Sequence, residues 1–183
     1  MTGVASRAER LLPWACVAAA VVLFASQLMT MFEFTPPGAE PLEDRSVIDH
    51  HGPALLIIAA FAVVTTVIAI SAASKPAAIA VAAMGGLALL IFLLIDLPDA
   101  GQVGTLNDAR QSFIDAEAIP QEGFWLEMLG AVALAFTGAA LATMSGEQLG
   151  ALRPGARREP KSPAPLRDVT DEPANTPANR ESA

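Results

Sequence analysis

The ionisable side chains that could do chemistry in this chain stand at the ends of its apolar runs. They are Glu33, Asp49, His50, Asp96 and Glu127. If the runs are helices packed together, their ends meet and these groups form one acidic ring. Carboxylates that lie close together in partly dry surroundings favour the binding of a proton or another cation. The ring is therefore a candidate cation or proton site.

A simpler interpretation fits the same residues. The helix dipole stabilises acids at the start of a helix, which accounts for Asp49 and Glu127, and acids at a helix end can reach water. A metal site is a narrower alternative, because His50 and His51 are neighbours and would point about 100° apart on a helix. Only one of them could join Asp96 or Glu127 around a divalent ion. No cofactor is predicted.

Four apolar runs dominate the chain, at residues 11–32, 53–71, 76–97 and 124–144. A helix needs about 20 apolar residues to cross the hydrocarbon core of a bilayer, where it must satisfy its own backbone hydrogen bonds. Hydrophobic residues make up 53% of the chain and charged residues only 16%, against roughly a quarter charged in soluble domains. We therefore predict an all-α, polytopic membrane protein with four transmembrane helices in a bundle.

Lys and Arg are divided unequally between the two sides of such a bundle. Nine lie in residues 1–10, in the turn around Lys75 and in residues 146–183, together with seven acids. The loops 33–52 and 98–123, with the adjoining ends of the runs, hold two basic residues and twelve acids. Because cytoplasmic segments are enriched in Lys and Arg, both termini are predicted to be cytoplasmic in a multi-pass protein of the cell (plasma) membrane.

The segments outside the runs differ in character. The first outer loop, 33–52, is Pro-rich and acidic, without apolar periodicity. In the second, Leu106, Ala109 and Phe113 recur at helical spacing after a capping Thr105, which predicts a short amphipathic helix over 106–118. The tail 146–183 cannot bury enough apolar surface to offset its chain entropy and is predicted to be disordered.

The first run also has the basic start of a signal peptide. Because its apolar residues continue to Phe32, we expect it to remain as an uncleaved span. The last run has small residues at helical spacing, and in lipid such residues let helix backbones approach closely. The candidate packing residues are Gly130, Ala131, Ala135, Gly138, Ala139 and Ala142. The sequence leaves open whether the helix they contact belongs to this chain or to another.

The side chains that most membrane enzymes need are missing from the sequence. There is one cysteine, the two histidines are adjacent, and no Gly-rich phosphate loop occurs. These absences argue against an enzyme, although one that acts on a lipid or envelope precursor at the acidic ring stays open as a third alternative. The small-residue stripe favours a non-catalytic accessory or scaffold subunit that acts through helix–helix association. Its predicted partners are the lipid bilayer and other membrane proteins or further copies of itself, with no nucleic acid. The alternative function is a cation or proton pathway or binding site at the acidic ring.

Overall fold

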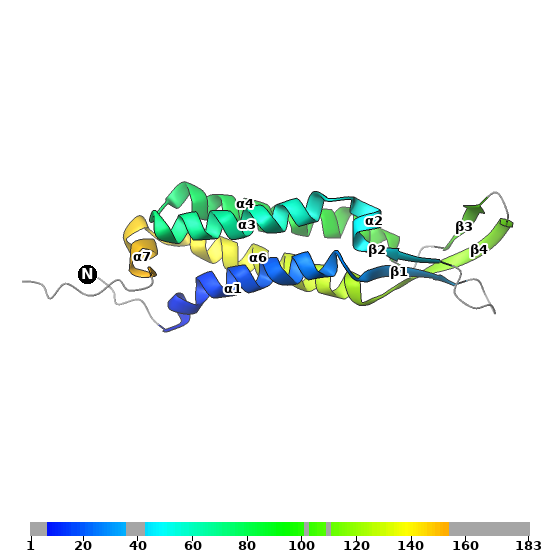
Figure 1. Cartoon of the computed structure of the whole chain (residues 1–183), viewed down its shortest axis with the longest axis horizontal. Coiled ribbons are helices and arrows are strands. Elements are labelled where there is room, and N and C mark those ends of the chain that lie inside the picture. The colour runs from blue at the N-terminus through cyan, green and yellow to red at the C-terminus, as the bar shows by residue number, and fades with distance from the viewer. Residues whose placement is uncertain (1–6, 36–42, 101–102, 109–110, 154–183) are drawn as a thin grey trace, which may run out of the picture.

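The structure, a computed structural model, describes residues 7–35, 43–100, 103–108 and 111–153. Within these ranges, only the backbone is described at positions 7, 35, 43–45, 49–50, 103–108 and 111–117. Four long helices lie side by side, and a small β-sheet extends beyond one end of them (Figure 1). We call this end the sheet end. The short helix α7 (Gly146–Ala151) lies at the opposite end.

The four long helices account for most of the described chain. They are α1 (Arg7–Ser26), α3 (Ala54–Ser71), α4 (Lys75–Ile91) and α6 (Glu122–Thr143). The helix α4 continues through a π-helical turn, η1 (Phe92–Asp96), into α5 (Leu97–Asp99). By length and composition, four helical segments could cross a membrane: Ala8–Ser26, Ala54–Ser71, Lys75–Asp99 and Glu122–Thr143. The prediction of four helices long and apolar enough to span a bilayer is confirmed.

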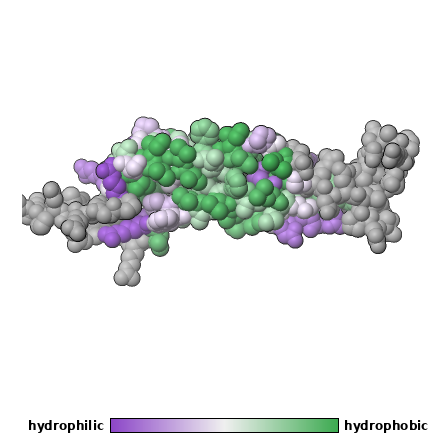
Figure 2. Space-filling model, viewed as in Figure 1, coloured by the Kyte–Doolittle hydropathy of each residue, from purple (hydrophilic) through white to green (hydrophobic). Residues whose placement is uncertain are grey.

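Each long helix packs against two neighbours. Helix α6 contacts α1 and α4, and α3 contacts the same two helices from the other side. Each helix contributes fully buried apolar side chains to the shared interior, among them Leu23, Leu55, Val81 and Leu134. Many large apolar side chains face outward instead, and Figure 2 shows a hydrophobic surface along the helices with hydrophilic residues towards both ends.

Glycines allow the helix backbones to come unusually close. A Cβ atom built on Gly85 of α4 would lie 2.6 Å from the backbone of Ala135, and one on Gly138 of α6 would lie 2.9 Å from Cα of Ala82. On the other side of α6, a Cβ on Gly130 would lie 2.8 Å from the backbone nitrogen of Leu23. The small residues of α6 therefore form contacts with helices of the same chain.

The turn between α3 and α4 is held by side chains at the end opposite the sheet. Ser74 caps α4 by accepting a hydrogen bond from the backbone N–H of Ala77. The ammonium group of Lys75 donates to the carbonyl oxygens of Ala142 and Met144, and its distance to the Met144 oxygen is 2.8 Å. Lys75 thus satisfies carbonyl groups at the C-terminal end of α6 that have no helical partner.

The outer segments form a four-stranded antiparallel sheet. Its strands are β1 (Thr30–Thr35), β2 (Glu43–Ser46), β3 (Val103–Asp108) and β4 (Gln111–Pro120), in the order β2-β1-β4-β3. β1 and β4 join the two outer segments, with Phe32 opposite Pro120 and Phe34 opposite Ala118.

The predicted amphipathic helix over 106–118 is wrong, and the fold is mostly helical rather than all-α. The described residues of this range, 106–108 and 111–118, belong to β3 and β4, which pair with each other from Val103 opposite Glu117 to Asp108 opposite Gln111. An isolated helix of this length is marginal in water. The edge of β1 supplies a ladder of hydrogen bonds that the helix would lack, and this long-range pairing overrides the local helical spacing.

Two further boundaries differ from those predicted from the sequence. Helix α1 ends at Ser26, before a turn at Gln27–Met29, so that Met31 and Phe32 lie in a strand and not in the first apolar helix. The start of the predicted disordered tail is helical, because α7 carries a capping box in which Ser145 and Gln148 exchange hydrogen bonds. Residues 154–183 lie outside the described part of the chain.

Candidate cation site

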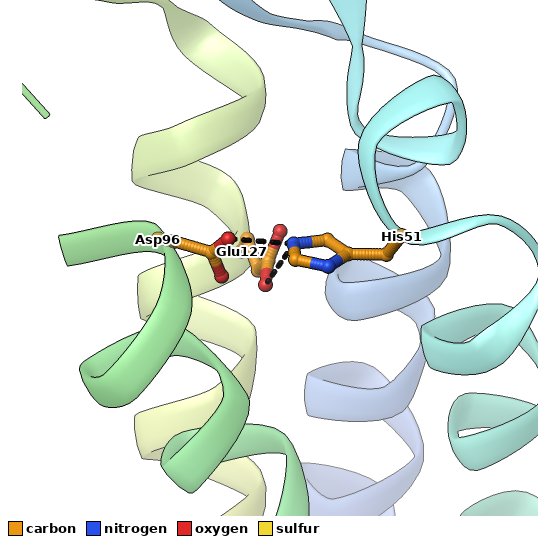
Figure 3. A group of neighbouring side chains, drawn as sticks. All are labelled: His51, Asp96 and Glu127. Carbon is orange, nitrogen blue, oxygen red and sulfur yellow. Dashed lines mark ion pairs between the residues drawn. The ribbon is translucent and has the colours of Figure 1, made fainter. Parts of the chain in front are cut away.

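Three ionisable side chains from different helices converge at the sheet end of the long helices. They are His51, the last residue of α2 (Val47–His51), Asp96, the last residue of η1, and Glu127 of α6 (Figure 3). The Nε2 atom of His51 lies 2.6 Å from Oδ1 of Asp96 and 3.9 Å from Oε1 of Glu127. One ligand atom from each residue lies within 4.8 Å of the other two. We call these three residues the His–Asp–Glu cluster.

The position of His51 follows from the way α2 is attached on both sides. Its first residue, Val47, is buried and donates its backbone N–H to the carbonyl oxygen of Met29 at 3.2 Å. Gly52 follows His51 with φ +60°, a left-handed conformation that favours glycine, and Pro53 then precedes α3. The left-handed residue Gly52 ends α2, so that the imidazole of His51 lies at the sheet end of the long helices.

Asp96 is positioned by the π-helical turn. A proline ring clashes with the carbonyl group four residues before it, which for Pro98 is the carbonyl of Leu94. The helix widens there, and the N–H of Leu97 bonds to the carbonyl oxygen of Phe92, five residues earlier. Phe92 and Asp96 are the buried residues of the turn. Such π-helical turns occur often at functional sites.

Glu127 is positioned by the junction between the sheet and α6. Gln121 donates its backbone N–H to the carbonyl oxygen of Met31 at 2.9 Å, and its side chain donates to Glu33 at 3.1 Å. Gly123 packs against the backbone of Thr30, where an added Cβ would lie 2.6 Å from the carbonyl oxygen. The first turn of α6 is therefore fixed against β1, which sets the direction in which Glu127 points.

Two buried aromatic residues share a helix face with the acids, because Phe92 is four residues before Asp96 and Phe124 is three residues before Glu127. The ring of Phe124 lies 5.0 Å from that of Phe92 and 5.8 Å from that of Phe32, measured between centroids. All three phenylalanines are buried. The carboxylates therefore lie next to apolar groups that cannot solvate them.

The electrostatics of the cluster favour an added positive charge. Asp96 and Glu127 are both 0% exposed, and the side chain of His51 is 7% exposed. With both carboxylates ionised, one net negative charge remains even if the imidazole is protonated. The oxygens of Glu127 accept no hydrogen bond from any donor in the described parts of the chain. A buried charge is costly unless it is paired or coordinates a metal.

One imidazole nitrogen with two carboxylate oxygens is a ligand set that suits divalent first-row metals such as zinc and manganese. Ligand atoms about 2.1 Å from a tetrahedral ion lie roughly 3.4 Å from one another. The His51–Glu127 separation is already close to this value, whereas the His51–Asp96 contact would have to lengthen by under about 1 Å. Such a shift lies within the reach of side-chain rotation.

A further buried side-chain oxygen lies on Gln27, just beyond the end of α1. Gln27 follows α1 and is 0% exposed; its amide nitrogen donates to Oγ of Ser26 at 3.3 Å, while its Oε1 atom has no hydrogen-bond partner among the described groups. Gly130 packs against Leu23. Gln27 is one turn beyond Leu23 towards the sheet, and Glu127 is about one turn beyond Gly130 in the same direction. The amide therefore lies towards the sheet end, which is also the end of the cluster.

The structure brings together part of the acidic ring. Asp96 and Glu127 are in contact range of one histidine, and that histidine is His51. Glu33 is half-buried and accepts a hydrogen bond from Gln121, and it is not one of the three residues of the cluster. The side chains of Asp49 and His50 lie outside the described residues. The signal that points to His51 is the Gly-Pro pair directly after it, which ends α2 at the imidazole.

The candidate packing residues divide between two environments. Gly130, Ala131 and Gly138 are buried between helices of this chain. Ala135 is half-buried where its backbone meets Gly85, whereas Ala139 is exposed. Ala142 is half-buried, and its carbonyl oxygen accepts from Lys75. Most of the stripe is thus occupied by contacts within the chain.

In comparisons with protein-family models, with curated proteins and with solved structures, nothing matches this chain.

Proposed function

We propose that this chain is an integral protein of the cell membrane whose four long helices cross the bilayer. The outward-facing apolar side chains support this, because water solvates apolar groups poorly whereas lipid acyl chains solvate them well. The excess of Lys and Arg in the N-terminal segment, the α3–α4 turn and the tail supports a cytoplasmic location for both termini. The sheet and the His–Asp–Glu cluster then belong to the outer side.

Within this membrane protein, we propose that the cluster binds a divalent metal ion. The observation that carries the proposal is the convergence of three metal-ligating side chains from three helices, two of them fully buried. Bound metal would neutralise both carboxylates when the imidazole is neutral. It would also tie together α2, η1 and α6, which meet at the sheet end of the long helices.

The surrounding residues favour a binding site over a pathway through the membrane. The buried polar or charged side chains of the described chain are Ser26, Gln27, Thr66, Asp96 and Glu127. Four of them lie at the sheet end, and Thr66 donates to the carbonyl oxygen of Ala62 in its own helix at 2.7 Å. Below the cluster Thr66 is the one buried polar side chain of the described helices, so an ion would find no continuous line of polar groups to carry it across. We infer a cation-binding protein that faces the outside.

The test is metal binding by the purified protein in detergent. We expect the wild-type chain to bind zinc or manganese, measured by calorimetry, and to give cobalt a ligand-field absorption spectrum. Glu127→Gln should weaken binding by at least about a hundredfold, because loss of an outer-shell partner alone typically costs 10- to 100-fold. Glu122→Gln is the matched control, since Glu122 is exposed on the same helix and should change nothing.

Two results would overturn the proposal. The first is a wild-type protein that binds none of these metals at millimolar concentration. The second is a Glu127→Gln variant that binds them as tightly as the wild-type chain does. The accessory or scaffold role stays a prediction, but the small residues that motivated it lie mostly against helices of the same chain.

A further inference from the structure

A groove with a volume of about 490 Å³ lies between α1 and α3, at the end of the helices opposite the sheet. Its apolar lining includes Pro13, Trp14 and Val17 from α1, with Val67 and Ile70 from α3. Trp14 and Val67 are 69% and 57% exposed. The groove therefore opens to the outer surface of the helices and is separate from the His–Asp–Glu cluster.

Two arginines complete the lining at the same end. Arg10 belongs to α1, and Arg153 follows α7, where its Nε atom donates to the carbonyl oxygen of Ile70 at 3.4 Å. Neither guanidinium forms an ion pair with a carboxylate in the described ranges. The groove thus combines an apolar wall with two cations whose charge is not balanced by the described chain.

We propose that this groove binds one anionic phospholipid of the inner leaflet. The guanidinium groups of Arg10 and Arg153 would hold its phosphate, and an acyl chain would lie along Val17 and Val67. Arginine suits phosphate because its planar donors match the oxygens in pairs. From Arg10 to Val17, α1 rises about 10 Å, so the groove extends from the level of the headgroups to the part of the acyl chains next to them.

The position of Trp14 supports a lipid as the occupant. Tryptophan is favoured where the headgroups meet the acyl chains, and Trp14 stands about one turn from Arg10 towards the bilayer centre. The excess of Lys and Arg supports a cytoplasmic location for this end of the helices, which would then contact the leaflet where anionic lipids are concentrated. This proposal rests on the membrane insertion proposed above but not on metal binding.

The test uses the two tryptophans as reporters. The full-length Trp125→Phe variant, which retains Trp14, is reconstituted into vesicles of phosphatidylcholine. A fixed fraction of the lipid is acyl-brominated phosphatidylglycerol in one sample and acyl-brominated phosphatidylcholine in the other. Bromine quenches tryptophan fluorescence on contact. The complementary Trp14→Phe variant reports from Trp125, which is exposed near the sheet end of α6 and should quench equally with both lipids.

We expect phosphatidylglycerol to bind beside Trp14 about thirty-fold more strongly than phosphatidylcholine, equivalent to about 1 kcal/mol for each arginine. The substitutions Arg10→Gln and Arg153→Gln together should remove this preference. Equal quenching of Trp14 by both lipids, or a preference that survives both substitutions, would overturn the lipid site alone. Absence of quenching at both tryptophans would overturn membrane insertion and, with it, this proposal.

Discussion

The adjacent glycines of α4 allow a sharp test of the packing between α4 and α6. Gly85 and Gly86 are neighbours in one helix, but only Gly85 faces α6. A Cβ atom on Gly85 would lie 2.6 Å from both N and Cα of Ala135 and 2.7 Å from the carbonyl carbon of Leu134. On Gly86 a Cβ would meet nothing within 4 Å. The same substitution by alanine should therefore have opposite effects at the two positions.

The magnitudes follow from these distances. Ordinary van der Waals contact begins at 3.4 Å, so the two helices must separate by about 0.8 Å to admit a methyl group on Gly85. The obstructing atoms belong to the backbone and cannot rotate away. Overpacking of this kind typically costs about 1–3 kcal/mol. At Gly86 only the gain in helix propensity remains, which is about 0.5–1 kcal/mol in favour of alanine.

The assay is equilibrium unfolding of the purified protein in mixed micelles, as the fraction of denaturing detergent is raised. We expect the free energy of unfolding to fall by about 1–2 kcal/mol for Gly85→Ala and to rise slightly for Gly86→Ala. Equal stability of the two variants would refute the close contact between α4 and α6. Equal stability would also mean that the small residues of α6 are again candidates for contact with another protein.

Two other substitutions test how the ends of the helices are held. Gly52→Ala should lower the free energy of unfolding by about 1–2 kcal/mol, because Gly52 has φ +60° and a left-handed conformation is strained for alanine. Gly86→Ala is the control, because its added methyl group also meets open space but its backbone does not have a positive φ. A loss of the same size in Gly86→Ala would contradict the explanation by backbone strain. Lys75→Met should cost about 2 kcal/mol in the same unfolding assay, since it removes a charged donor from the carbonyl groups of Ala142 and Met144. Lys75→Arg keeps a charged donor and is the control, and a loss of similar size in both variants would argue that the charge is not what holds this end of α6.

The long helices could be predicted from the sequence because their cause is local. A run of about 20 apolar residues such as 124–144 meets the requirement for crossing a bilayer without reference to any other part of the chain. Proline and serine also act locally, as Pro98 and the capping Ser74 show. The acids at the helix ends are a consequence of the same pattern, so Asp96 and Glu127 could be named as members of one ring.

The sheet depends instead on pairing between residues far apart in the chain. The spacing of Leu106, Ala109 and Phe113 fits a helix when that segment is considered alone. The described residues of that segment form strands because β1, some 80 residues earlier in the chain, offers an edge opposite β4. No local pattern contains that information, and the end of α1 at Ser26 was missed for the same reason, since Met31 and Phe32 are apolar enough for either structure.

The choice of His51 as the third member of the cluster was likewise made by the tertiary structure. A regular helix through residues 49–51 leaves the direction of each imidazole undetermined until the next element is placed. The left-handed turn at Gly52 and the buried Val47 fix α2, and the π-helical turn before Pro98 brings Asp96 to the same level. The sequence thus determined which residue types stand at the ends of the helices. Only the packing of α2, η1 and α6 decided which of them meet, because three separate backbones must converge before their side chains can share one ion.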